Sequence, residues 1–510
     1  MDILGLVYVP SWLLTFFLFL ISLYLYSKYK LSFWKRLGVP HPKPTLFFGH
    51  GPLMKDGVGE LDLRMLSTYD KVVGLYVFHK ASLLVLDPEI VRDVLIKNFS
   101  SMPNRTQYFK QKSDLQHSLS RLHGDHWRFM RNTLSPVFAT GNMRKISPVL
   151  AESCRRLLRN IEDKKNCGNA IEFKQMFGNF SMDAIAALGF GIDLDLYKNE
   201  NNEFAIRAQA IFNAFKGLGV FLNLLVPPLY NLLVKLGLDL DGQSKHCLYF
   251  KRLVEQAKTL RQKDDQNRND ILQLMLNVHN DTEVSDTEQF NSYKDNREEW
   301  RKRGLTTNEV NGNSIMFMVA GYETTASALT FTAYCLATNP ESQDRLLQEI
   351  DSTIGKGVPD YDNIQKMEYL ECVVKEALRI CPPAQRIMRE TCEDLVIAGY
   401  TIPKNTEITI STYALHRSPK FWTEPEKYKP ERFLAVNKSN LTPYTFLPFG
   451  LGPRSCLAMR LAYFEAKCAL VTILQKYKFM PCEKTEIPLQ LDPKLVLKPK
   501  NGVYLTIKER

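Results

Sequence analysis

The chain has 510 residues, of which 45% are hydrophobic and 24% charged, the balance of an ordinary globular protein. Its net charge of +11 suits an anionic partner such as a membrane surface or an acidic protein. Nucleic acid is excluded as a partner because the sequence has no zinc spacing, RNA-binding signature or arginine-rich tail. The ten cysteines form no Cys-x-x-Cys pair and are too sparse for a secreted disulfide framework.

The first predicted element is a membrane anchor at the N-terminus. Residues 3–27 carry no formal charge and are about as long as one bilayer crossing requires. Four cations follow them: Lys28, Lys30, Lys35 and Arg36. By the positive-inside rule, these cations place the rest of the chain in the cytosol. No small-residue cleavage site closes the stretch, which disfavours the alternative of a removed signal peptide.

The sequence therefore predicts three parts. Residues 1–30 form a signal anchor and single transmembrane helix, residues 31–50 a proline-rich hinge, and residues 51–510 one large domain. Alternating prolines between residues 38 and 44 favour a stiff, extended connector. No Gly/Ser-rich linker or internal repeat divides the remainder.

Strands are expected first in the large domain, and helices after them. Alternating apolar residues predict strands at Val72–Phe78 and Ser82–Leu86, and helical periodicity dominates from Ile90 onward. This periodicity predicts amphipathic helices over residues 146–160, 182–188, 203–215 and 248–263. Residues 217–237 are very apolar, and one interpretation places them in the core.

The C-terminal half begins with a polar, charged stretch at residues 281–304, which is typical of a mobile surface connector. A long helix is predicted over 308–339, where Pro340 ends it, and a second helix over 365–380. A short strand follows at Glu407–Ser411. The expected fold class is mainly α with a small β portion.

One cysteine, Cys456, stands in the run Phe-x-x-Gly-x-Arg-x-Cys that begins at Phe449. Gly452 lets the loop turn with positive φ and lets the backbone approach a flat macrocycle, and Arg454 can bind a haem propionate. An apolar helical stretch, residues 457–477, would direct its positive end toward the sulfur and favour the thiolate. The alternative interpretation is a buried structural cysteine.

This run resembles the haem-ligand loop of the cytochrome P-450 monooxygenases. It departs from the family pattern at Ala458, where the family usually has glycine. The resemblance covers nearly all of the chain after the anchor and is strongest over residues 308–477. It implies the cytochrome P-450 fold and haem b as the cofactor, with Cys456 as the axial ligand of the iron.

The predicted long helix contains Ala320-Gly321-Tyr322-Glu323-Thr324-Thr325. Ala320 and Thr324 share one helical face, where small residues would let a flat ligand lie against the backbone. The run resembles the family's oxygen-activation motif. That resemblance implies that Thr324 holds a distal hydrogen bond and that Glu323 supplies protons; ordinary helix packing is the alternative.

Further residues have roles that the resemblance implies. Glu376 and Arg379 would form a buried ion pair that Arg432 completes, in a structural role. Haem contacts would come from Arg105, Trp127, Arg131, Ala320, Arg389, Phe449 and Arg454. The alternatives are a core aromatic for Trp127 and solvated arginines. Substrate contacts would come from Ser120, Met316, Val319, Ala384 and Gln385. For residues 217–237 the family suggests short helices that dip into the membrane.

The resemblance implies a monooxygenase that inserts one oxygen atom from O2 into a lipophilic substrate such as a xenobiotic, steroid or fatty acid. Electrons would come from NADPH through NADPH–cytochrome P-450 reductase, with cytochrome b5 as a further partner, at the endoplasmic reticulum membrane. Basic residues expected to dock the reductase are Arg128, Lys467 and Lys476. The alternatives are a thromboxane-synthase-like isomerase of fatty-acid peroxides, against which Glu323 and Thr324 argue, and a non-enzymatic haem sensor.

Overall fold

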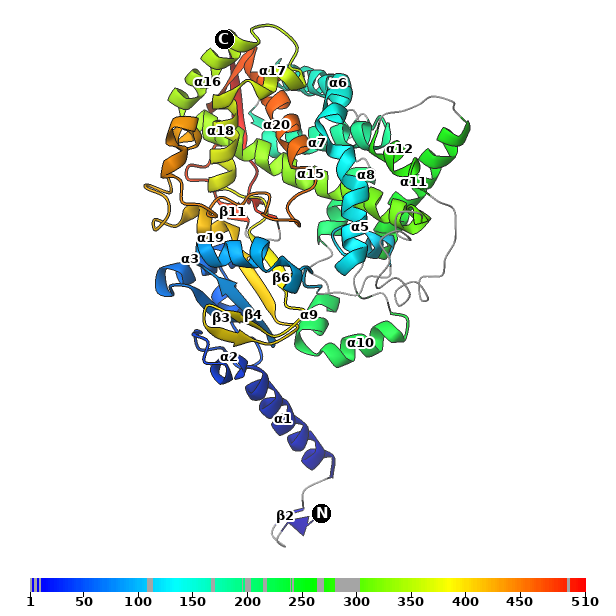
Figure 1. Ribbon diagram of the computed structural model, residues 1–510, viewed down its shortest axis with the longest axis vertical. Helices are drawn as coiled ribbons and strands as arrows, with labels where there is room; N and C mark the ends of the chain where they lie inside the picture. The colour runs from blue at the N-terminus through cyan, green and yellow to red at the C-terminus, as the bar shows by residue number, and fades with distance from the viewer. Residues whose placement is uncertain are drawn as a thin grey trace.

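A long helix, α15 (Thr307–Thr338), runs through the middle of the computed structural model, and most of its residues are buried. Helices pack around it, and a small sheet lies between this helical part and the N-terminal helix α1 (Figure 1). The structure describes residues 1–510 except 1, 4–6, 9–10, 108–112, 167–169, 195, 198–202, 214–217, 239, 241–242, 264–269, 280–302 and 493–495. The predicted connector at 281–304 lies almost entirely outside the described residues.

The helices confirm the mainly α prediction. Those before α15 are α1 (Ser11–Lys30), α2 (Phe33–Arg36), α3 (Val58–Thr68), α4 (Pro88–Arg92), α5 (Gly124–Leu134), α6 (Thr140–Asn166), α7 (Phe173–Phe190), α8 (Glu203–Asn213), α9 (Leu218–Leu225), α10 (Pro227–Lys235), α11 (Ser244–Lys263) and α12 (Ile271–Leu276). Those after it are α16 (Pro340–Thr353), α17 (Tyr361–Gln365), α18 (Glu368–Ile380), α19 (Thr412–Arg417) and α20 (Met459–Leu474). The predicted helix over 365–380 is α18, which begins three residues later because a break at Lys366 and Met367 separates it from the short α17.

The main sheet has the strand order β3–β4–β9–β6, in which β4 and β9 are parallel and the other pairs antiparallel. Its strands are β3 (Val72–Val77), β4 (Lys80–Val85), β6 (Arg386–Glu390) and β9 (Glu407–Ser411). A second sheet joins β10 (Tyr477–Pro481), β13 (Tyr504–Glu509) and β5 (Ile171–Glu172). Short pairs are β1 (Asp2–Ile3) with β2 (Val7–Tyr8), β7 (Leu395–Ile397) with β8 (Tyr400–Ile402), and β11 (Leu491–Asp492) with β12 (Lys498–Pro499).

The N-terminal helix α1 projects from the body, and its apolar side chains are mostly exposed. It is long and apolar enough to cross a membrane, which agrees with the predicted anchor. The segment after it is packed on the main sheet rather than free. Trp34 is fully buried against Gly74, its indole N–H donates to the Leu75 carbonyl at 2.9 Å, and the Gly74 N–H donates to the Pro40 carbonyl at 2.8 Å.

Within the apolar stretch, Leu218–Leu225 form α9 and Pro227–Lys235 form α10, and both lie at the end of the body from which α1 projects (Figure 1). Placing the whole stretch in the core is wrong for α10 and its C-cap, because Leu229, Leu232 and the C-cap residue Leu236 are exposed by 41%, 53% and 70%. Only Tyr230 of α10 is buried. A helix with such side chains in solvent needs an apolar partner.

Candidate functional site

The loop that carries Cys456 turns at two glycines, Gly450 and Gly452, both with φ of +73°. A Cβ on Gly452 would stand 2.0 Å from the Leu95 carbonyl oxygen, so only glycine fits there. The Cys456 N–H donates to the Phe449 carbonyl at 2.8 Å and closes the loop. The positive φ that the sequence predicted for Gly452 is confirmed.

The Cys456 thiol is accessible, yet burial among protein atoms raises its pKa. Both observations hold if the sulfur faces a hollow inside the protein. A hydrogen bond from the Ala458 amide and the charges of Arg105 and Arg131 oppose this rise and favour the thiolate. The thiolate is the form that ligates iron.

On α15 the accessible residues form one stripe. Between residues 310 and 333 the helix is buried except at Met316, Ala320, Gly321, Thr324 and Ala328. Four of these five recur every four residues and so share one helical face. The Thr324 hydroxyl lies on this stripe and donates to the Ala320 carbonyl at 2.8 Å. The predicted small residues and alcohol therefore line one accessible face.

Glu323 is adjacent to Thr324 in sequence but lies off this stripe. Its carboxylate is buried and forms an ion pair with Lys174 of α7 at 3.0 Å, while Lys498 lies 4.0 Å away. Burial lowers the pKa of Lys174, and the charge of Glu323 opposes that shift. The structure therefore does not bring Glu323 and Thr324 onto the same surface. No sequence pattern could have indicated Lys174 as the partner.

Four buried or half-buried arginines gather beside the Cys456 loop. Arg131 donates to the Ser455 carbonyl at 2.7 Å, and Arg105 donates to the Arg454 carbonyl at 3.3 Å. Arg454 donates to two carbonyls from residues 103 and 122, both at 2.7 Å, and its guanidinium lies 4.3 Å from the Trp127 ring. Arg389 of β6 is 1% exposed and belongs to the same group, since the charge of Arg105 acts on it.

These cations repel one another without a counter-ion. Burial, followed by the charges of Arg105, Arg389 and Arg131, lowers the pKa of Arg454 to about 8. Burial and the charge of Arg105 lower the pKa of Arg389 to about 9. Among the described residues no carboxylate pairs with any of the four, and Arg389 Nε and Arg454 Nη1 lack hydrogen-bond partners. Buried charges require partners, so the cluster fits a dianionic ligand such as the two propionates of haem.

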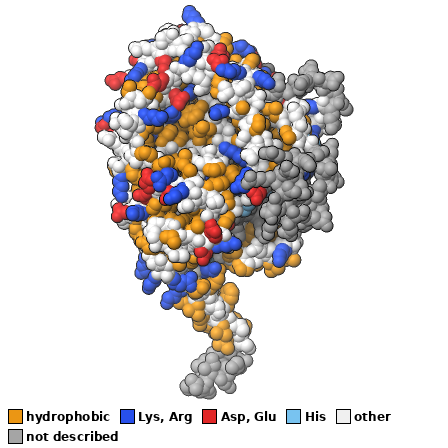
Figure 2. Space-filling model, viewed as in Figure 1, with side chains coloured by type: hydrophobic (Ala, Val, Ile, Leu, Met, Phe, Trp, Pro, Cys, Tyr) orange, Lys and Arg blue, Asp and Glu red, His pale blue; other side chains and the backbone are white. Residues whose placement is uncertain are grey.

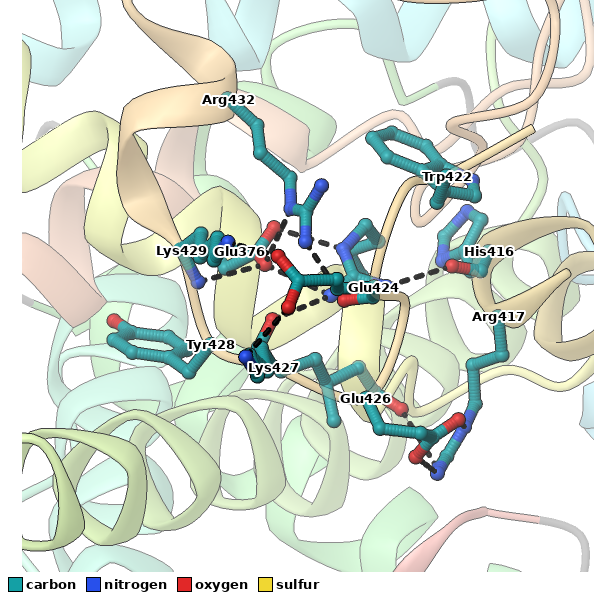
Figure 3. A network of polar contacts seen from close by, with 12 residues as sticks. Glu376, His416, Arg417, Trp422, Glu424, Glu426, Lys427, Tyr428, Lys429 and Arg432 are labelled. Carbon is teal, nitrogen blue, oxygen red and sulfur yellow. Dashed lines mark hydrogen bonds and ion pairs between the residues drawn. The ribbon is translucent and has the colours of Figure 1, made fainter. Parts of the chain in front are cut away.

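Glu376, Arg379 and Arg432 lie together as the resemblance implied, and Figure 3 shows Arg432 beside Glu376. Glu376 and Arg379 of α18 are fully buried and form two hydrogen bonds of 2.8 Å. Arg432, in the 3-10 turn Pro430–Phe433, lies 3.2 Å from the same carboxylate. Arg379 also donates to the His416 carbonyl at 2.9 Å. The triad thus joins α18 to the chain that leads to the Cys456 loop.

The predicted substrate residues divide into two groups. Ser120 and Met316 are half-buried and Ala384 is exposed, so these three are accessible. Val319 is buried in the core. Gln385 is also buried, and its amide oxygen lies 2.7 Å from where a Cβ on Gly59 of α3 would stand, so its side chain points toward α3. The remaining haem prediction, Phe449, is half-buried and packs on Tyr463 with ring centroids 5.0 Å apart.

The predicted docking residues are mostly engaged. Lys467 is buried and paired with Glu371 at 2.9 Å, so its prediction as a surface contact is wrong. Arg128 pairs with Asp125 at 2.9 Å, and Lys476 pairs with Glu162 at 3.0 Å.

Two exposed cations beside the loop were missed, Arg460 and Lys97. Arg460 stands four residues after Cys456, which is a signal that the sequence offered. Lys97 lies two residues from Leu95, whose carbonyl meets Gly452, and only the fold places it there.

Known proteins match this chain along most of its length. The sequence pattern of the cytochrome P450 family matches residues 39–507. Cytochrome P450 3A28 of Bos taurus is 35% identical over 495 residues, covering 96% of this chain and 94% of the relative. Cytochrome P450 3A14 of Cavia porcellus is 34% identical over 513 residues, covering 100% and 99%. Cytochrome P450 3A13 of Mus musculus is 36% identical over 497 residues, covering 96% and 95%.

Proposed function

Because this chain belongs to the cytochrome P450 family and is a haem-thiolate monooxygenase, we propose that it oxidises lipophilic small molecules from a position on the endoplasmic reticulum membrane. The observation that carries this proposal is the accessible stripe of α15. It is apolar apart from the hydroxyl of Thr324, and it lies on an otherwise buried helix. Such a surface favours lipophilic compounds, and xenobiotics, steroids and fatty acids are the lipophilic classes that the family resemblance implies.

When bound, haem with its thiolate ligand supplies the cleavage of dioxygen and the transfer of one oxygen atom to carbon. Cys456 would ligate the iron. Arg105, Arg131, Arg389 and Arg454, with Trp127 under Arg454, would hold the propionates, since these cations have no other anion among the described residues. Their buried side chains would also orient the macrocycle and exclude water from its edge.

Protons would reach the substrate side through Thr324. Its Oγ1 donates to the Ala320 carbonyl, which leaves the oxygen lone pairs available on the accessible face. Glu323 would supply protons to that face only after its pair with Lys174 rearranges, since its carboxylate lies elsewhere. A carboxylate can relay a proton only when it comes within hydrogen-bond reach of the group it serves, directly or through one water, so this rearrangement is a requirement of the role proposed for Glu323.

Two features support a membrane position with the body in the cytosol. Figure 2 shows hydrophobic side chains along the projecting helix and a group of Lys and Arg side chains where it joins the body. Cations on that side of a crossing favour the cytosol. The exposed leucines of α10 lie at the same end and would enter the lipid surface.

Electrons would come from NADPH through a flavoprotein reductase, with cytochrome b5 as a second donor. The docking face would be the one beside the Cys456 loop, where Arg460, Lys97 and Arg128 are exposed. An acidic partner surface would be attracted there, and the attraction would weaken with salt.

The test uses the purified full-length protein and its Cys456→Ser variant. We expect a strongly red-shifted Soret band in the reduced, carbon-monoxide-bound protein that the variant lacks. In vesicles with reductase and NADPH, testosterone or lauric acid should be hydroxylated with one oxygen atom from O2. A histidine-type band would contradict the ligand assignment. A correct band with neither compound bound nor oxidised would contradict the substrate proposal alone.

A further inference from the structure

A short segment that carries Ser120 lies directly on the start of α15. Within it, the 3-10 helix η4 (Asp114–His117) packs against α15 at Gly312. A Cβ on Gly312 would stand 2.2 Å from the Asp114 carbonyl oxygen and 3.3 Å from the Ser118 nitrogen. The two backbones are therefore in contact. This contact fixes the distance between the two backbones, but it does not fix the register of the segment along the helix.

Asn313, the residue after Gly312, fixes the register of the segment along α15. It is fully buried, and its side-chain oxygen accepts the Leu119 N–H at 2.8 Å. Its side-chain nitrogen donates to the Glu309 carbonyl of its own helix at 2.8 Å and lies 3.3 Å from the Met130 sulfur of α5. One amide thus joins the segment, α15 and α5.

The bond to Leu119 also fixes its neighbours. The Ser118 hydroxyl donates to the Leu115 carbonyl at 2.7 Å and lies 3.0 Å from the Ser120 hydroxyl. Ser118 and Leu119 are buried, whereas Ser120 is half-buried. Ser120 is therefore the residue of this group that reaches accessible space, and its place follows from the amide beside it.

Asn313 stands at the head of the accessible stripe. Met316 follows it by three residues and Ala320 by seven, so all three share one helical face. The segment held by Asn313 therefore meets α15 where the stripe begins.

We propose that Asn313 is a positioning residue for the monooxygenase reaction. By holding the Leu119 amide, it fixes Ser120 at the head of the stripe and so sets the shape of the space in which a substrate lies. This inference rests on the proposed placement of the substrate along Ser120 and Met316.

The decisive variant is Asn313→Ser. A serine hydroxyl can donate to the carbonyl four residues earlier, which replaces the bond to Glu309, but it is too short to accept the Leu119 N–H. The matched control is Asn311→Ser. Asn311 is equally buried on the same helix, and neither of its amide atoms has a hydrogen-bond partner among the described residues.

Two measurements on the full-length, haem-loaded proteins test the proposal. Hydrogen exchange followed by mass spectrometry reports on the peptide that contains Leu119. The Soret shift on titration reports the Kd of clotrimazole, a bulky azole, and of imidazole, a small one. In Asn313→Ser we expect the exchange rate of the Leu119 amide and the Kd of clotrimazole each to rise by about 10-fold. A factor of this size corresponds to the free energy of about one hydrogen bond. The imidazole Kd should stay within about 2-fold because imidazole needs little space.

If exchange at Leu119 is the same in the Asn313→Ser and Asn311→Ser proteins, the proposal is overturned. The proposal is also overturned if exchange at Leu119 rises but the ratio of the clotrimazole Kd to the imidazole Kd is unchanged. In that case the bond between Asn313 and Leu119 would not determine the shape of the substrate space. Neither result touches the proposed function, which the wild-type spectrum and products decide. Should Asn313→Ser fail to take up haem, Asn313→Thr takes its place, because its hydroxyl likewise can donate to the Glu309 carbonyl but is too short to accept the Leu119 N–H, and the same two outcomes apply.

Discussion

At the scale of single residues, Glu323 and Thr324 show how neighbours in sequence take different positions. On an α-helix they point about 100° apart. Thr324 reaches the accessible stripe, whereas Glu323 forms a buried pair with Lys174. The alcohol therefore lies on the accessible face where proton transfer is proposed, whereas the acid would reach that face only after its pair with Lys174 rearranges. Members of the family that only rearrange peroxides would not require the alcohol at this position.

Thr324→Ala should uncouple the reaction. Without the hydroxyl, protons arrive at the wrong time, and electrons from NADPH should leave as hydrogen peroxide. We expect product per NADPH to fall by about 100-fold, the lower end of the range for a proton-transfer group. The matched control is Thr330→Ala, whose hydroxyl makes the same bond to the carbonyl four residues earlier but lies off the stripe. Equal coupling in the two variants would contradict the role of Thr324.

At the scale of elements, two polar clusters hold helices in place where apolar packing alone would let them slide. One is the triad of Glu376, Arg379 and Arg432, which fastens α18 to the chain before the Cys456 loop. The other is at the start of α15, where one carboxylate oxygen of Glu309 accepts a hydrogen bond from His126 Nε2 of α5 at 2.6 Å. The other oxygen accepts the backbone N–H of Thr306, the N-cap residue, in a capping box. Each cluster contains a buried charge that is favourable only while its partners remain.

Glu376→Ala should abolish stable haem loading. It leaves two arginines without their carboxylate, and breaking a buried pair costs about 3–5 kcal/mol. The yield of haem-loaded protein, measured by its carbon-monoxide spectrum, should collapse. Glu426→Ala is the control, since Glu426 also pairs with an arginine, Arg417, but is 62% exposed. Because its carboxylate stays largely in water, loss of Glu426 should cost less than loss of the fully buried Glu376, and a loss of haem in both variants would contradict the structural role of the triad.

In the Glu309→Gln variant the free energy of unfolding should depend less on pH in the acidic range. Burial alone would raise the pKa of Glu309, but the hydrogen bond from His126, with the charge of Arg303, holds it at about 2. An unfolded glutamate titrates near 4.3, so the unfolded state binds more protons between these values. The stabilisation, about 3 kcal/mol, is complete above pH 5 and is lost as pH falls toward 2. The Tm difference between wild type and Glu309→Gln should therefore narrow from pH 6.5 to pH 4. A difference that does not change with pH would contradict this.

At the scale of the whole molecule, the anchor, the sheet and the helical body occupy successive levels (Figure 1). The packed segment after α1 fixes the anchor to the main sheet through Trp34 and Pro40. With α1 as the proposed membrane anchor, the position of the body relative to the membrane would follow from the fold rather than from a free linker. It would also determine which face remains open to a soluble domain of the proposed redox partner.

Arg460→Glu should weaken reductase docking. Reversing an exposed cation beside the Cys456 loop replaces attraction of an acidic surface by repulsion. The reductase concentration for half-maximal turnover should rise several-fold at low salt, and the effect should shrink at high salt. Lys484→Glu is the control, because Lys484 is also exposed but lies over the ring of Tyr504 of β13, which belongs to the second sheet and not to the Cys456 loop. Equal effects from both variants would contradict a docking face at the loop.

Much of the fold could be predicted from local patterns. The strand at Glu407–Ser411 was predicted with its observed bounds, and the long helix was predicted to within one residue at each end. Its capping box at Thr306 and the proline after it are local signals. The exposed leucines of α10 were ambiguous, because an apolar run reads alike whether it meets a core or a membrane.

The sequence by itself determined the family and the fold class, and it predicts the thiolate ligand and a membrane anchor. These depend on residue types at short spacings, which a chain carries whatever its fold. Only the tertiary structure decided that Lys467 is buried, that Glu323 pairs with Lys174, and that Asn313 holds Leu119, 194 residues away. Such contacts join segments that are far apart in the chain. The residue pattern of one segment does not indicate which other segment will pack against it.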